Sequence, residues 1–310
     1  MHNHSHHQSH QHSNSDQQDQ RIGWAFFLNV TFTIIEFIGG WLTNSTAIMA
    51  DAVHDLGDSL SLGFAWILSK LSNKKSPQEF SYGYKRLSLF GALINSIILI
   101  TGSLFVLFES ISRLSDPPMP MVEGMLALAI LGTLVNGYAV YKLSAGNTLN
   151  EKVITWHLLE DVLGWIAVLI VSIVLMFIEL PILDPLLSIG FTLFILFNVF
   201  RSLKSTISLF LQAVPSRMVQ QEMLNLLKSK SPVGEVHHFH FWSLDGESHV
   251  LTAHLALKET LDISDIKLLK EEIAKDLAPF NLSHTTIEFE FPDEVCRDEK
   301  NSSHNSKPRY

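Results

Sequence analysis

The sequence predicts an α-helical membrane protein with six transmembrane helices, followed by a small α+β domain that faces water. Only 17% of its 310 residues are charged, whereas a soluble domain usually carries about 25%. The apolar residues gather in the first two thirds of the chain, and the last third has an ordinary soluble composition. We therefore expect a disordered His-rich tail at 1–20, a membrane domain at 21–207, a soluble domain at 208–292 and a disordered tail at 293–310.

Six apolar segments have the length of about 20 residues that a membrane-spanning helix needs. They are residues 22–42, 46–68, 87–107, 122–143, 153–178 and 183–203. Lysine and arginine concentrate in the loops after the second, fourth and sixth segments, and Arg113 is the main exception on the opposite side. Because positively charged loops stay in the cytoplasm, we expect both termini and the C-terminal domain to be cytoplasmic, in the inner membrane of a bacterial cell.

Two copies of the pattern H-x-x-x-D lie inside these apolar segments. His54 and Asp58 belong to the second segment, and His157 and Asp161 belong to the fifth. A spacing of four places both side chains of a pair on one face of a helix. An ionisable group at membrane depth is costly, so it marks a functional site. The neighbouring acidic residues of these segments are second-rank candidates: Asp51, Asp55 and Glu160.

Two imidazoles and two carboxylates form a ligand set that zinc accepts in tetrahedral geometry, while shells of oxygen alone suit magnesium, calcium or manganese. Metal ligands must lose their protons to bind, and histidine titrates near neutral pH. The four residues therefore predict a transporter that exchanges zinc for protons. The alternatives are another metal such as cadmium, cobalt or iron, a structural zinc site, a metal-free proton relay, and a membrane-anchored zinc sensor without transport.

Other classes of protein are disfavoured by what the sequence lacks. An intramembrane metalloprotease needs an H-E-x-x-H helix, and the chain has no such pattern, so we expect no enzyme. A net charge of −9 without a basic stripe argues against nucleic acid as a partner. The single cysteine, Cys296, rules out a disulfide framework within the chain.

Longer motifs surround these residues, at 44–58, 82–86, 157–161, 184–188, 236–242 and 286–290. With them, the chain resembles the cation diffusion facilitators, and most of all their bacterial zinc-exporting branch. The resemblance implies a homodimer in the lipid bilayer that exports zinc against protons, with the two H-x-x-x-D pairs as its transport site. Some members bind a further metal between the second and third spans, but the loop 69–80 has no histidine or aspartate, so we expect no site there. Ser88 stands where many members have an acidic residue.

The last third of the chain predicts a ferredoxin-like domain with the element order α-β-β-α-β. The amphipathic and alternating patterns give the expected bounds. They are a helix at 218–229, strands at 235–244 and 249–257 around a turn at 245–246, a helix at 264–277 and a strand at 284–291. Ser264 is the expected N-cap of the second helix.

This domain is rich in side chains that bind metals. Strand alternation places His238 and His240 on one face and His237 on the other. The resemblance implies a zinc site with His237, His254 and an acidic residue near Glu290. Further candidates lie nearby: His240, His284, Glu288 and Cys296. We expect zinc to bridge the two cytoplasmic domains of a dimer as a regulatory ligand; the alternative is a set of solvated histidines.

The first twelve residues hold six histidines. Such a tract is typical of a weak metal-gathering tail, and the alternative is a polar tail whose histidines are incidental.

Overall fold

In a computed structural model, the described residues are 9–72, 80–143 and 149–298. Within these ranges the side chains of 9–22, 69–70, 72, 142–143 and 149–158 lie outside the description. The described residues fall into two compact units, divided between Lys204 and Ser205. We describe each unit by itself.

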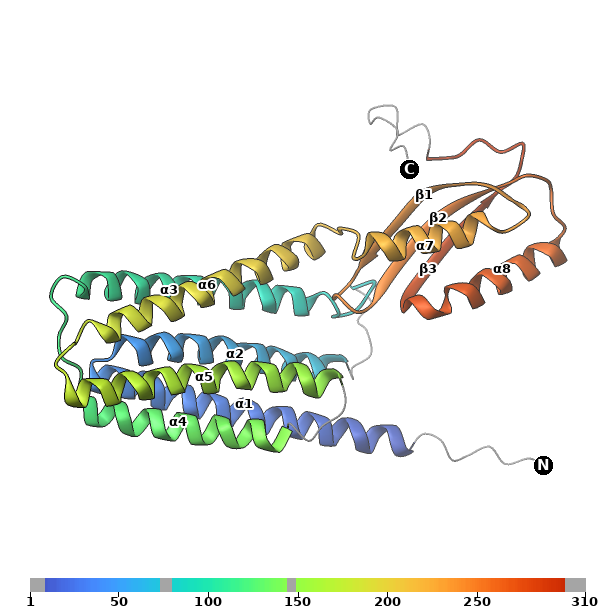
Figure 1. Ribbon diagram of the computed structural model, residues 1–310. Coiled ribbons are helices and arrows are strands. Elements are labelled where there is room, and N and C mark those ends of the chain that lie inside the picture. Colours follow the sequence, from blue (N-terminus) through green and yellow to red (C-terminus); the bar gives the residue numbers. More distant parts are fainter. Residues whose placement is uncertain (1–8, 73–79, 144–148, 299–310) are drawn as a thin grey trace. The chain divides into compact units, whose positions relative to one another are not determined.

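Six long helices form the first unit, and residues 205–210 at the end of the sixth belong to the second unit (Figure 1). They are α1 (Ser9–Thr43), α2 (Thr46–Ser72), α3 (Leu87–Arg113), α4 (Val122–Leu143), α5 (Leu149–Phe177) and α6 (Leu183–Phe210). The six helices predicted from hydropathy are confirmed, with α1 beginning inside the predicted tail and α6 ending beyond the predicted boundary. Five of the helices are apolar and long enough to cross a membrane. The sixth, α2, has 27 residues but carries several aspartates along its length.

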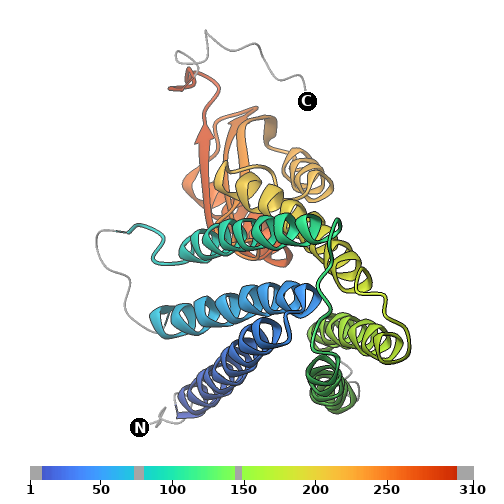
Figure 2. The ribbon, with the colours of Figure 1, turned by 90° about the vertical axis from the view of Figure 1, so that its left-hand side faces the viewer.

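Two apolar clusters hold these helices together. One joins α1, α2, α4 and α5 around the fully buried Trp165 and Met125. The indole of Trp165 lies so close to α4 that a Cβ added at Gly132 would come within 2.2 Å of it. The other cluster joins α2, α3 and α6 through Val53, Leu99 and further apolar residues. Figure 2 looks along the bundle and shows α1 beside α2. Helix α2 therefore contacts both clusters and lies at the centre of the unit.

The second unit contains α7 (Arg217–Lys228), β1 (Val233–Ser243), β2 (His249–Leu257), α8 (Ile263–Leu277), the 3₁₀ turn η1 (Ala278–Phe280) and β3 (Leu282–Glu290). The sheet has the order β1-β2-β3. Strands β1 and β2 are antiparallel, while β2 and β3 are parallel because α8 carries the chain back between them. A core of its own packs the helices on the sheet, with Met223, Leu227 and Leu251 fully buried. The predicted order α-β-β-α-β is confirmed.

The caps of the two helices are polar side chains just before their first turns. Ser216 caps α7, and its hydroxyl accepts the N–H of Val219. Asp262 caps α8, and its carboxylate accepts the N–H of Asp265 at 2.8 Å. The predicted cap, Ser264, is wrong: it lies inside the helix and donates to Asp262. Both residue types are good caps, so composition did not decide between them.

A β-bulge interrupts the first strand at its histidines. His237 lies opposite His254, but His240 lies opposite Thr252, so β1 has one residue more than β2 between these pairs. The extra length is taken up at His238, whose φ is 45°. The predicted alternation of faces is therefore wrong for His238, since its ring centre lies 5.0 Å from that of His254.

Candidate metal sites

The first candidate site lies inside the helical unit, between α2 and α5. His54 and Asp58 come from α2 and Asp161 comes from α5, and one ligand atom of each lies within 4.8 Å of the others. His54 Nε2 is 3.6 Å from Asp161 Oδ1, and these side chains are 21% and 11% exposed. The i, i+4 spacing on α2 turns both of its ligands to one face, and that face meets α5.

The fourth predicted ligand is His157. It belongs to α5, one helical turn before Asp161, but its side chain lies outside the described residues. Its place among the ligands stays a prediction from the i, i+4 spacing.

A cavity of about 540 Å³ adjoins this group. Its walls come from α2, α5 and α6, and they include His54, Asp161 and two of the second-rank candidates, Asp51 and Glu160. Phe191 and Phe194 line it from α6. The cavity has room for an ion with part of its water shell, directly beside the three possible ligands.

A carboxyl on α1 was missed by reasoning from the sequence. Glu36 is fully buried, and neither carboxylate oxygen has a hydrogen-bond partner among the residues that the structure describes. The carboxyl groups of Asp55 and Asp51 on α2 interact electrostatically with Glu36, and both residues are 7% exposed. Asp51 and Asp55 do not belong to the group of possible ligands formed by His54, Asp58 and Asp161, although Asp51 lines the adjoining cavity. The signal was present, since Glu36 is an ionisable residue within an apolar segment.

The second candidate site lies in the C-terminal unit. His237, His254, Glu290 and Cys296 each offer one ligand atom, and these atoms all lie within 4.8 Å of one another. His254 Nδ1 is 2.8 Å from Glu290 Oε1, and His237 Nε2 is 2.9 Å from Glu290 Oε2. Cys296 Sγ is 3.6 Å from His254 Nδ1. Two nitrogens, one oxygen and one sulfur are a suitable donor set for tetrahedral zinc.

The sheet brings three of these four ligands together. His237 on β1 lies opposite His254 on β2. Glu290 on β3 lies opposite Ala256, which follows His254 by two residues on β2. Cys296 lies beyond the end of β3 and is buried against them. Burial alone raises the pKa of Glu290, but contacts with Cys296, His254 and His237 outweigh it, so the pKa of this carboxyl lies below its ordinary value. The arrangement therefore favours an ionised carboxylate ready to bind a cation.

The other predicted candidates lie at different distances from this group. Glu288 Oε2 is 3.7 Å from His254 Nε2 and also pairs with Arg297 at 2.9 Å, so it borders the group. His240 and His284 are not brought into it. Beyond the bulge, His240 is exposed and lines a different hollow with Gln220. His284 lies opposite Val250, about 13 Å along the strand from Glu288.

Two family models match consecutive parts of the chain. The cation efflux transmembrane domain matches residues 24–211, and the cytoplasmic domain of cation efflux proteins matches residues 215–291. The chain belongs to the cation diffusion facilitator family. As a member of this family, the chain is a multi-pass membrane protein for the efflux of metal cations. The two matches confirm the resemblance seen in the sequence.

Curated relatives of this cation diffusion facilitator come from several bacteria. A "Cadmium, cobalt and zinc/H(+)-K(+) antiporter" of Bacillus velezensis is 30% identical over 286 residues, which is 91% of each chain. The "Zinc transporter ZitB" of Escherichia coli is 30% identical over 294 residues, 93% of this chain and 92% of the relative. The "Metal cation efflux system protein CzcD" of Cupriavidus metallidurans is 28% identical over 284 residues, 91% and 89% of the two chains.

Proposed function

We propose that this cation diffusion facilitator exports zinc from the cytoplasm in exchange for protons. The ion binds between α2 and α5, to His54 and Asp58 on one helix and to His157 and Asp161 on the other. The site opens in turn to each side of the membrane. The protein works as a homodimer in the cell inner membrane, with both termini in the cytoplasm.

The observation that carries this proposal is the meeting of His54, Asp58 and Asp161 within 4.8 Å inside the helical unit. Taking ionisable groups into a membrane is costly, and this cost is offset when they bind a cation. The adjoining cavity of about 540 Å³ supports passage of the ion, since a site that only stabilises a fold needs no such space. The names of the relatives support zinc as the cargo.

Exchange for protons follows from the chemistry of the ligands. Metal and protons compete for the imidazole of His54 and for the carboxylates of Asp58 and Asp161. When the site faces the more acidic side, protons displace the metal, and when it faces the cytoplasm, the metal displaces the protons. The printed name of the Bacillus relative, which includes H(+), supports this coupling. The same name includes cadmium and cobalt, which we propose as secondary cargoes.

The cytoplasmic domain is proposed to hold a regulatory zinc ion. Its ligands are His237, His254, Glu290 and Cys296, with Glu288 at the border of the site. Zinc bound there ties β1, β2 and β3 to the segment after β3, which changes the surface that the domain presents to its dimer partner. In this way cytosolic zinc biases the transporter.

A zinc sensor without transport is the second reading of the same chain. It needs the histidines of the C-terminal unit and has no use for the group between α2 and α5. The burial of that group favours transport.

Zinc transport by the full chain in lipid vesicles tests the proposal. Vesicles with an acidic lumen should accumulate zinc, and Asp58→Ala and Asp161→Ala should each abolish the accumulation. Glu123→Gln is the matched control, because Glu123 is an exposed acidic residue at the start of α4. Equal uptake by the wild type and both alanine variants would overturn the proposal.

A further inference from the structure

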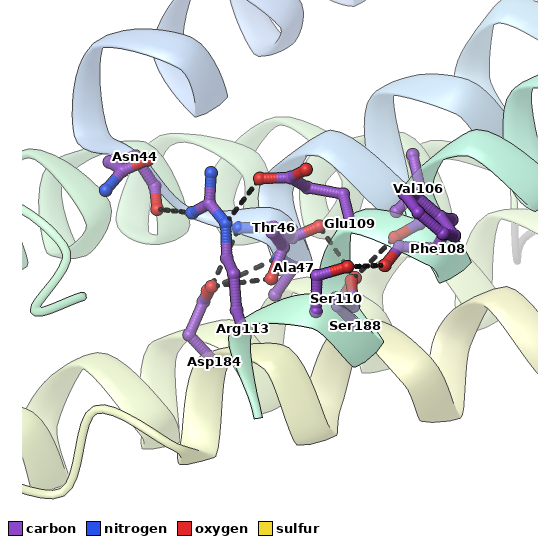
Figure 3. A network of polar contacts seen from close by, with 11 residues as sticks. Asn44, Thr46, Ala47, Val106, Phe108, Glu109, Ser110, Arg113, Asp184 and Ser188 are labelled. Atoms are coloured by element: carbon purple, nitrogen blue, oxygen red, sulfur yellow. Dashed lines mark hydrogen bonds and ion pairs between the residues drawn. The ribbon is translucent and has the colours of Figure 1, made fainter. Parts of the chain in front are cut away.

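A buried carboxylate at the start of α6 holds the start of α2. Asp184 is 2% exposed. Its oxygens accept the backbone N–H of Thr46 at 2.7 Å and that of Ala47 at 3.3 Å. They also accept the hydroxyls of Thr46, at 2.8 Å, and of Ser45. Figure 3 shows Asp184 reaching from α6 to Thr46 and Ala47 at the start of α2.

These contacts make Asp184 an N-cap that comes from another helix. The first N–H groups of a helix have no partner within it, and a residue just before the helix usually supplies one. Here Ser45 does so for Ile48 N–H, at 3.2 Å, while Asp184 takes the N–H groups of Thr46 and Ala47. A negative charge also interacts favourably with the positive end of the helix dipole, and its hydrogen bonds are stronger than neutral ones.

Neighbouring polar contacts fix the same end of α2 from two sides. Ser188, one turn further along α6, donates to the carbonyl of Thr46 at 2.9 Å, and its hydroxyl lies 2.8 Å from that of Ser110 on α3. Arg113 at the end of α3 donates to the carbonyl of Asn44 at 2.9 Å. Figure 3 shows this network running from α6 through the start of α2 to α3. The start of α2 is therefore anchored to α3 and α6, whose described residues belong to neither group of possible metal ligands.

The anchored residues are connected rigidly to the metal group. His54 and Asp58 follow Thr46 on the same helix, about 12 and 18 Å along its axis at 1.5 Å per residue. A helix transmits an axial shift of its first turn to such positions, and a site that is loose by about 1 Å loses much of its function. Asp161 belongs to α5, which this network does not contact in the described part of the chain. The apolar cluster around Trp165 also packs Ala47 and Ile48 of α2 against α5. Apolar contacts are not directional, whereas hydrogen bonds are, so the cap contributes to the height of α2 relative to α5.

We propose that Asp184 is a positioning residue for transport, because it caps α2 from α6 and so holds His54 and Asp58 at the height of Asp161. Both of its oxygens accept hydrogen bonds from the first residues of α2 and from Ser45 just before it. It also stands apart from both groups of possible metal ligands in the described residues. The inference rests on the proposed transport function.

The test is zinc transport by the full chain in vesicles, with KM and kcat determined separately. We expect Asp184→Ala to raise the KM for zinc by roughly tenfold, which is about 1.4 kcal/mol, with a smaller effect on kcat. Asp184→Asn keeps one oxygen that accepts the N–H groups, so its KM should lie between those of the wild type and the alanine variant. Glu179→Gln is the matched control, since Glu179 is an exposed acidic residue in the connection before α6.

A double-mutant cycle separates positioning from a general loss of stability. Thr46→Val removes the hydroxyl that donates to Asp184 at 2.8 Å and changes little else in shape. We expect the double variant with Asp184→Ala to have the KM of Asp184→Ala alone. Additive effects would overturn the proposal, and so would a wild-type KM in Asp184→Ala.

The proposed function and the positioning role fail in different ways. The proposed function is contradicted if the wild type does not transport zinc, or if Asp161→Ala still transports it. In that case the same Asp184 variants are titrated with zinc in detergent on a His254→Ala background, which removes a ligand of the cytoplasmic site. Affinity that falls in the order wild type, Asp184→Asn, Asp184→Ala still supports positioning, and equal affinity in all three overturns it.

Discussion

Cys296 is the ligand candidate whose removal gives the sharpest measurement. Its thiol is buried 3.6 Å from His254 Nδ1 and belongs to the group with His237 and Glu290. Apparent binding free energies of about 10–16 kcal/mol for structural zinc with four ligands correspond to about 2.5–4 kcal/mol per ligand. At about 1.4 kcal/mol per tenfold change, the loss of one ligand weakens binding by roughly 60- to 700-fold. Because serine keeps a weak oxygen donor, we expect about 100-fold for Cys296→Ser.

The assay uses residues 205–310, whose described part, 205–298, has a hydrophobic core of its own. Zinc affinity is measured by competition with a chelator of known strength. Cobalt is then bound in place of zinc, and its near-ultraviolet absorption reports whether a thiolate is a ligand. We expect that band in the wild type and its loss in Cys296→Ser. His284→Asn is the control, because His284 is exposed and outside the group in the described structure. Equal affinities, or a wild-type cobalt complex without the thiolate band, would refute the reasoning.

Three further predictions concern stability. Gly132→Ala should lower the midpoint temperature of unfolding in detergent by several degrees, since its Cβ would come within 2.2 Å of Trp165. Overpacking of this kind costs about 1–3 kcal/mol. An unchanged midpoint would contradict this close packing of α4 on α5. Glu36→Met should raise that midpoint, because burying a polar group without a hydrogen bond costs about 1–3 kcal/mol. A lower midpoint would show that the Glu36 carboxyl stabilises the fold and would contradict the prediction. Burial, opposed by the charge of Asp245, holds the pKa of His249 below 6.5. The unfolded domain therefore binds more protons as pH falls below about 6.5, and stability is lost there. His249→Phe should reduce the fall in unfolding free energy between pH 7.5 and 5.5, and equal pH slopes in both proteins would count against this cause.

The length and polarity of the chain were enough to predict its helices. A span of apolar residues has few alternatives in a membrane, so the six helices and the order of the C-terminal elements followed from pattern alone. Helix α2 was found in spite of its aspartates because the apolar residues around them keep a helical period. The i, i+4 spacing fixed the face of each helix on which a pair lies. It does not say which faces meet, so the joint site of His54, Asp58 and Asp161 was inferred from their matching ligand types and from the family resemblance.

The details that escaped prediction depend on contacts between distant residues. The bulge at His238 depends on how β1 pairs with β2, and alternation along one strand carries no information about such pairing. Cys296, and not His240 or His284, joins the group of His237, His254 and Glu290 because of where the chain turns after β3. Asp184 was noted as part of a motif, but its role as a cap for α2 depends on the packing of α6 beside α2.

The central claim is that zinc and protons move in opposite directions through the group of His54, Asp58, His157 and Asp161. The most direct measurement records both fluxes at once in the same vesicles, with a zinc indicator and a pH indicator in the lumen. When zinc is added outside, we expect the lumen to gain zinc and lose protons together, and neither change in Asp161→Ala. Zinc uptake without a matching rise of the luminal pH, or coupled fluxes that persist in Asp161→Ala, would contradict the account.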